Sequence, residues 1–214
     1  MASLLPRTLT PLFSRLILEH STLPTRRKTM DGGKVKIFGV AGSLRKGSFN
    51  KMLLKAALEV APQEVELEIF DLEGIPPFNQ DLENYPHQKV TELKEKVKGA
   101  DGILIVTPEY NYSVPGVLKN AIDAASRPYG TNPFEGKPVA IMGASIGMLG
   151  TARAQYHLRQ ILVSLNAFPL NRPEIMVPFA ESKFDETGRL TDETTREKVK
   201  EFLAELVRWT RKLK

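Results

Sequence analysis

The stretch Gly39-Val40-Ala41-Gly42-Ser43-Leu44-Arg45-Lys46-Gly47-Ser48-Phe49-Asn50 decides the fold. It follows an apolar run, residues 35–40, which predicts a buried strand, and it precedes residues 51–58, which predict a helix. Glycines, hydroxyls, an amide and an arginine lie between the two. The first turn of a helix has unpaired backbone N–H groups and a partial positive charge. A turn of this composition at that place therefore predicts a phosphate site.

The polar side chains of this turn are suited to phosphate oxygens. Ser43 and Ser48 can donate hydroxyl hydrogen bonds, Asn50 can donate from its amide, and Arg45 carries a charged fork. The glycine spacing matches neither the dinucleotide fingerprint nor the P-loop of nucleotidases. An ordinary strand-to-helix turn, capped by Ser48 or Asn50, remains the alternative.

Beyond this turn, apolar runs and amphipathic segments alternate along the chain. This alternation predicts a parallel, doubly wound α/β sheet with helices on both faces and the strand order 2-1-3-4-5. In that topology ligands bind beyond the carboxyl ends of strands one and three. The expected strands are residues 35–40, 65–70, 102–106, 138–142 and 174–177, and the expected helices are 49–60, 88–98, one opened by Pro115, 152–165 and 193–212.

Two further loops follow predicted strands at the same edge of the sheet. The loop after strand three contains Tyr110-Asn111-Tyr112 between prolines, which suits a flat polar heterocycle that needs an aromatic wall and a polar edge. A tyrosine pair buried at a subunit contact is the alternative. The loop after strand four, residues 143–150, is rich in small residues, and Ser145 could donate to a ring there.

Composition excludes several classes of site. The 214 residues include no cysteine, which excludes disulfides, thiol nucleophiles and cysteine-based zinc sites. The three histidines lack any ligand-like spacing, so we expect no metal site. No apolar run approaches the roughly 18 residues of a membrane span. Residues 1–34 hold six basic and two acidic residues, a charge of +4, whereas the other 180 hold 24 and 23, a charge of +1, so the body carries no nucleic-acid signal.

The segment before the first strand has a composition of its own. Residues 1–29 are rich in Leu, Ser, Thr and Arg with one acidic residue, as in an organellar transit peptide. Alternatively, Met30 is the true start. We expect residues 1–33 to be an extension outside the fold and residues 34–214 to form one domain. The expected location is cytoplasmic, or organellar if residues 1–29 are a transit peptide.

No residue is arranged for acid, base or nucleophilic catalysis, so the chemistry would belong to a bound cofactor. A phosphate site at one end and a ring site at the other describe a mononucleotide. The segments 42–50, 107–116, 118–123 and 154–162 resemble the NADPH-dependent FMN reductase family, and within it the bacterial quinone and chromate reductases. The resemblance covers residues 34–214.

This resemblance implies a flavodoxin-like three-layer sandwich that holds FMN non-covalently. NADPH or NADH would reduce the flavin, which would then reduce quinones, azo dyes or chromate in a ping-pong cycle. Members are commonly homodimers or homotetramers, act on small-molecule acceptors, and have no membrane span. The implied cofactor-binding residues are Ser43, Arg45, Lys46, Gly47, Ser48, Phe49, Asn50, Pro108, Glu109, Tyr110, Asn111, Tyr112, Ser145 and Gly147.

Two other functions stay open at this point: a flavodoxin-like electron carrier and a flavin-binding regulatory module. Carriers of that type are usually strongly acidic, whereas this body has a charge of +1. A second group of residues could bind the 2′-phosphate of NADPH, pair across a subunit interface, or be solvated; it comprises Arg127, Tyr129, Arg153, Tyr156 and Arg159. The pair Lys119/Asp123, at i,i+4, is expected to support its own helix.

Overall fold

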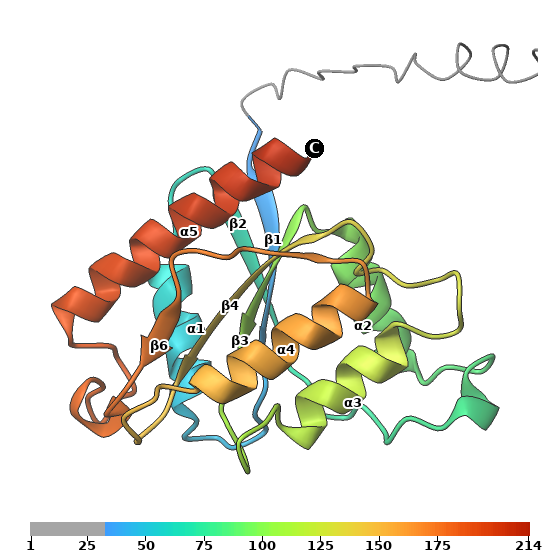
Figure 1. Ribbon diagram of the computed structural model, residues 1–214, viewed down its shortest axis with the longest axis horizontal. Coiled ribbons are helices and arrows are strands. Elements are labelled where there is room, and N and C mark those ends of the chain that lie inside the picture. Colours follow the sequence, from blue (N-terminus) through green and yellow to red (C-terminus); the bar gives the residue numbers. More distant parts are fainter. Residues whose placement is uncertain (1–32) are drawn as a thin grey trace, which may run out of the picture. The chain divides into compact units, whose positions relative to one another are not determined.

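The computed structural model describes residues 33–214, so the predicted extension and its transit-peptide hypothesis lie outside the described residues. Strands and helices alternate along the chain (Figure 1). The strands are β1 (Val35–Ala41), β2 (Val65–Phe70), β3 (Gly102–Val106), β4 (Pro138–Ala144), β5 (Phe168–Pro169) and β6 (Ile175–Val177). The helices are α1 (Phe49–Glu59), α2 (Gln88–Gly99), α3 (Gly116–Ala125), α4 (Ala152–Ser164) and α5 (Glu193–Leu213).

All strand pairs are parallel, and the order along the sheet is β2-β1-β3-β4-β5. The predicted α/β fold with the order 2-1-3-4-5 is therefore confirmed. The central strands β1 and β3 are buried over nearly their whole length, as expected of strands covered on both faces. Because all strands point the same way, their carboxyl ends lie along one edge, the lower edge in Figure 1.

Alternate residues of each strand enter two separate hydrophobic cores. In β3, Leu104 and Val106 pack toward α1 and α5, whereas Ile103 and Ile105 pack toward α2, α3 and α4. The period of two residues in a strand produces this division. The result is a three-layer arrangement, with α2, α3 and α4 on one face of the sheet and α1 and α5 on the other (Figure 1).

At the edge of the sheet beyond β4, the sequence predicted a single fifth strand at residues 174–177, and the structure differs. Two short strands pair with β4 instead: β5 with its first residues and β6 with its last. Pro169 and Pro173 lie in this part of the chain, and proline has no N–H to donate to a ladder. Strand β4 is also two residues longer than expected and ends at Ala144 rather than Met142, because its last residues pair with β6.

Helix α5 packs on the same face of the sheet as α1 and begins at a charged cap. The carboxylate of Asp192 accepts from the Thr195 backbone N–H at 2.9 Å and from the Lys183 ammonium at 2.9 Å, and also from the Thr195 hydroxyl. The hydroxyl bond, followed by the Lys183 bond, lowers the pKa of Asp192 to about 2. Over residues 33–214, no helix combines the length and the apolar character that crossing a bilayer requires.

Candidate cofactor site

Three loops meet at the carboxyl edge of the sheet, after β1, β3 and β4. The first and second loops are adjacent because the Gly42 N–H donates to the Val106 carbonyl at 2.9 Å. The second and third approach so closely that a Cβ on Gly143 would lie 2.3 Å from the Thr107 carbonyl oxygen. The predicted convergence of the loops after strands one and three is thus present in the structure.

The first loop presents a row of backbone donors at the start of α1. Ser48 is the N-cap, and its hydroxyl oxygen accepts from the N–H groups of Asn50 and Lys51 at 3.3 and 3.4 Å. Residues 46–47 form a turn before the helix, and within the described chain the backbone N–H groups of Lys46, Gly47 and Phe49 have no hydrogen-bond acceptor. Free donors at a helix N-terminus are suited to a phosphate.

Two serines and two cations surround this row. Ser43 and Ser48 are each 3% exposed and accept backbone hydrogen bonds, which leaves both hydroxyl protons free for a ligand. Arg45 and Lys46 are exposed and, among residues 33–214, form no ion pair. The Arg45 guanidinium lies 5.7 Å from the ring centroid of Phe49. Hence this loop carries a local excess of positive charge.

Asn50 connects the first loop to the end of β4. It is 2% exposed; its Nδ2 donates to the Ala144 carbonyl at 2.9 Å and its Oδ1 accepts from the Ala144 N–H at 2.9 Å. The sequence predicted that this amide donates to a phosphate. Both polar atoms are engaged with β4, which leaves one amide hydrogen for a ligand and makes Asn50 foremost a link between two loops.

The second loop contains a tight turn with unusual backbone angles. Tyr110 and Ser113 exchange two backbone hydrogen bonds, of 3.1 and 3.0 Å. Between them, Asn111 has φ +50° and Tyr112 has φ +64°, both in the left-handed region. Tyr110 and Tyr112 remain 51% and 66% exposed. Two tyrosines are therefore exposed in the loop that follows β3.

Glu109 and Pro108 precede this turn and are largely buried. One oxygen of Glu109 accepts from Arg153 Nε at 2.6 Å, and the other accepts from the Ala154 backbone N–H at 3.1 Å. Glu109 therefore caps the N-terminus of α4 from a different loop, where a carboxylate is favoured by the helix dipole. The sequence predicted that Glu109 contacts the ring of the cofactor. Such a contact would have to use the part of Glu109 that does not face α4.

The third loop is held against the chain after β6. The Ser145 N–H donates to the Val177 carbonyl at 3.0 Å, and its hydroxyl donates to the Gly147 carbonyl at 3.2 Å. A Cβ on Gly147 would meet only the Ser145 hydroxyl, at 3.8 Å, so the space above it is open. Ile146 and Met148 are 61% and 73% exposed. The loop thus offers an open, partly apolar surface facing solvent.

Of the residues considered for the 2′-phosphate of NADPH or a subunit interface, two form ion pairs within residues 33–214. Arg127 pairs with Glu83 at 2.9 Å and stacks on the Tyr129 ring at 3.6 Å, while Arg153 pairs with Glu109. Arg159 donates to the Leu170 carbonyl at 3.0 Å. Lys119 and Asp123 form the predicted pair on α3, with distances of 2.7 and 2.8 Å.

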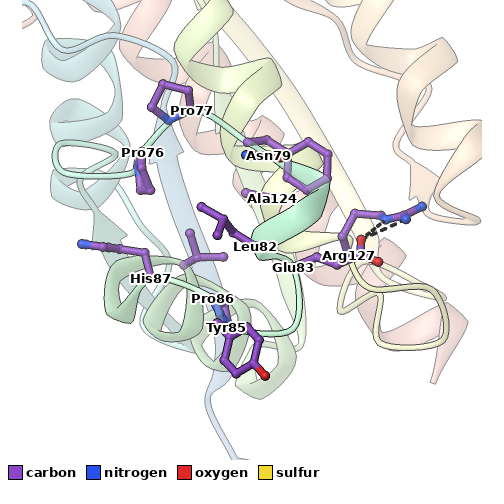
Figure 2. Close-up of a pocket in the computed structure, with 12 residues that line it drawn as sticks. Pro76, Pro77, Asn79, Leu82, Glu83, Tyr85, Pro86, His87, Ala124 and Arg127 are labelled. Atoms are coloured by element: carbon purple, nitrogen blue, oxygen red, sulfur yellow. Dashed lines mark hydrogen bonds and ion pairs between the residues drawn. The ribbon is translucent and has the colours of Figure 1, made fainter.

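Arg127 and Glu83 border an apolar pocket of about 300 Å³ at another part of the surface (Figure 2). The loop before α2 forms its wall and the helices α2 and α3 form its floor. None of the predicted cofactor-binding residues lines it. The residues that do are Pro76, Pro77, Phe78, Asn79, Leu82, Glu83, Tyr85, Pro86, His87, Val90, Ala124 and Arg127.

Sequence reasoning missed one residue beside the second loop. His157 Nδ1 lies 3.0 Å from the Ser113 hydroxyl, although no histidine lies within a predicted site loop. Arg153 and His157 are four residues apart and therefore lie on one face of α4, a spacing that could have indicated a shared contact. In the part of the chain that the structure describes, no three His, Cys, Asp or Glu side chains form a group able to hold a metal ion.

The donor set fits FMN. A row of free N–H groups, two serine hydroxyls and two unpaired cations suit a phosphate, and the exposed tyrosines and open glycine loop suit a flat ring. The edge where they meet is where ligands bind in sheets of this order. The geometry therefore suits a mononucleotide, and the first loop lacks the glycine spacing of a dinucleotide-binding loop.

Three known proteins and one family model are similar to most of this chain. An NAD(P)H-dependent FMN reductase from Pseudomonas aeruginosa is 49% identical over 182 residues, which cover 84% of this chain and 97% of that protein. A quinone reductase from Escherichia coli is 46% identical over 167 residues, covering 76% and 88%. A solved structure of a flavoenzyme NAD(P)H:(acceptor) oxidoreductase from Paracoccus denitrificans is 35% identical with a TM-score of 0.77, covering 83% and 98%. The family model "NADPH-dependent FMN reductase" matches residues 35–182, and this chain belongs to that family.

Proposed function

We propose that this chain is an NAD(P)H-dependent FMN reductase that reduces quinones, with electrons passing through non-covalently held FMN. The observation that carries the proposal is the first loop, where free N–H groups, two hydroxyls and two cations converge at the start of α1. Identities of 46–49% to an FMN reductase and a quinone reductase support the same activity.

The first loop would hold the phosphate of the cofactor. Ser43 and Ser48 would donate from their hydroxyls, and Arg45 and Lys46 would supply the charge that balances a phosphate dianion. Gly47 would allow close approach, because no atom lies within 4 Å of its Cβ position. Phe49 and Asn50 would hold the loop in place, Phe49 by packing on Phe184 at 5.6 Å.

The second and third loops would receive the ring. Tyr110, Asn111 and Tyr112 would form its wall, supported by Pro108 and Glu109 beneath them. Ser145 and Gly147 would border the ring on the other side. When bound, FMN supplies the chemistry, because it accepts a hydride from NADPH or NADH and passes reducing equivalents to the acceptor. The residues of this chain then act by holding cofactor, donor and acceptor in the right relative orientation and by limiting the access of water to the site.

A second copy of the chain would complete this surface. The side chains of Tyr110, Tyr112, Ile146 and Met148 are all at least half exposed. Exposed apolar side chains concentrated at one site are typical of an interface. We therefore expect a homodimer or homotetramer, which size-exclusion chromatography with light scattering would reveal.

The deciding experiment is to record an absorbance spectrum of the purified protein and then to add NADPH in the absence of air. Oxidised flavin gives bands near about 375 and 450 nm, and their loss on adding NADPH, followed by recovery with a quinone, supports the reductase. Protein that takes up no FMN would refute the cofactor assignment. Bound flavin that neither NADPH nor NADH reduces would favour an electron carrier or a regulatory module.

A further inference from the structure

The turn Tyr110–Ser113 is held in a backbone conformation that its residues do not favour. Tyr112 has φ +64°, and left-handed angles are rare for bulky residues. Such angles persist only where the surrounding structure imposes them, and they concentrate at ligand sites. The residues Tyr110 and Tyr112 are 51% and 66% exposed, so burial in a core does not explain the conformation.

One face of α4 holds this turn from both ends. Before the turn, Glu109 accepts from Arg153 Nε at 2.6 Å and from the Ala154 N–H at 3.1 Å. At the end of the turn, the Ser113 hydroxyl lies 3.0 Å from His157 Nδ1. Arg153 also lies over the Tyr112 ring, 3.6 Å from its centroid, which fixes the ring itself.

Neither Arg153 nor His157 serves the hydrophobic core. The Arg153 side chain is 38% exposed and His157 is exposed. Their removal would leave no buried cavity. Loss of Arg153 would leave the largely buried Glu109 carboxylate without its cation, so the structural effect would also fall on the residue that precedes the turn. Their polar contacts instead converge on the loop that carries the two exposed tyrosines.

We infer that Arg153 and His157 are positioning residues, which hold the Tyr110–Ser113 turn in the form that receives the flavin ring before the flavin arrives. This inference rests on the proposed function. It also assigns Arg153 a role different from binding the 2′-phosphate of NADPH, because its Nε is already paired with Glu109 and its plane is stacked on Tyr112.

The test compares Arg153→Met and His157→Leu with the parent chain. FMN and riboflavin are titrated into flavin-free protein, and the exchange of the Ser113 amide hydrogen is measured without flavin. We expect each variant to weaken the binding of FMN and of riboflavin by the same factor, about tenfold, because the turn would contact the ring that both ligands share. Exchange at Ser113, whose N–H donates to Tyr110, should become faster.

Three controls make the result specific. His157→Asn keeps a polar atom near the position of Nδ1 and should restore the parent affinity. Arg208→Met removes an arginine that pairs with Glu205 on α5, and it should leave both affinities unchanged. Steady-state kinetics with NADPH and NADH should show that Arg153→Met affects both donors equally.

Several outcomes would overturn the inference. Parent affinities for both flavins together with unchanged Ser113 exchange would show that the turn does not depend on α4. A rise in KM for NADPH alone would assign Arg153 to the 2′-phosphate. If the parent protein itself binds neither flavin, the proposed function fails, and the inference fails with it, whatever the Ser113 exchange shows.

Discussion

Asn50 and Ala144 lie 94 residues apart in the sequence and exchange two hydrogen bonds of 2.9 Å each. This pair connects the loop after β1 with the end of β4. The two bonds are buried, where hydrogen bonds are less exposed to competition from water. Replacing Asn50 should therefore lower the stability of the fold and alter the conformation of the loop after β1.

We predict that Asn50→Ala lowers the free energy of unfolding by about 1–3 kcal/mol, because two buried backbone groups of Ala144 lose their partner. FMN affinity should fall at least about tenfold, since the loop loses its link to β4. Urea denaturation and flavin titration measure the two effects. Asn132→Ala is the matched control: it also removes an amide that bonds two backbone groups, Leu165 O and Phe134 N, and should lower stability only. Equal FMN affinity in both variants would contradict the role of Asn50.

Arg45→Ala should weaken FMN binding by about 10- to 100-fold, the usual range for a charge-assisted hydrogen bond to phosphate. Riboflavin, which lacks the phosphate, should bind the variant and the parent equally. Isothermal titration of flavin-free protein with both ligands makes the comparison. Lys55→Ala removes an exposed cation from α1 and should change neither affinity. An equal loss for riboflavin would argue that Arg45 acts elsewhere than on the phosphate.

Two glycines should respond in opposite ways to alanine. Gly143→Ala would place a Cβ 2.1 Å from the Thr151 hydroxyl oxygen and 2.3 Å from the Thr107 carbonyl, so we expect a loss of at least about 1–3 kcal/mol of stability. Gly47→Ala meets no atom within 4 Å and should leave the flavin-free protein as stable as the parent. It should nevertheless reduce FMN affinity, because the added methyl group would obstruct the phosphate. Thermal unfolding with and without FMN distinguishes these effects, and an unchanged FMN affinity would count against close approach at Gly47.

The cap of α5 should make stability depend on acid pH. The pKa of Asp192 is lowered to about 2, so its charged form stabilises the fold above the ordinary aspartate pKa of 3.8, and this contribution is lost as the pH falls toward 2. At pH 7 Asp192→Ala should cost about 0.5–2 kcal/mol, the usual range for an N-cap. The difference from the parent should shrink below about pH 4.

Fluorescence of Trp209, the single tryptophan, can follow this unfolding because its indole N–H donates to the Phe168 carbonyl and so reports the contact of α5 with β5. Glu201→Gln, an exposed change within α5, serves as the control for loss of a carboxylate. A difference between Asp192→Ala and the parent that stays constant from pH 7 to 2 would show that the charge of Asp192 does not contribute.

Most of the fold could be predicted because its signals are local. Residues 102–106 are a continuous apolar run, and residues 193–212 have an amphipathic pattern. Such runs and patterns show strand and helix without knowledge of distant residues. The predicted strand order is likewise confirmed. The division of the last strand was missed because short proline-containing segments carry little periodicity.

The meeting of the loops after β1 and β3 was predicted from the sequence, but the contacts within these loops were not. The polar turn after β1 is visible in the sequence because hydroxyls, glycines and an arginine gather there. The capping of α4 by Glu109 and the left-handed angle of Tyr112 depend on residues brought together only by folding. Which of the predicted residues contact FMN stays a prediction that the flavin titrations address.

The divided last strand also affects how the protein behaves at high concentration. An exposed, long and flat sheet edge can pair with another chain and seed aggregation. Here β5 has two residues and β6 has three, so neither offers a long row of free backbone groups. At the opposite edge, β2 carries Glu66 and Glu68, and Glu68 is paired with Lys96. Short strands at one edge and charges at the other should keep the sheet from extending into a neighbouring molecule.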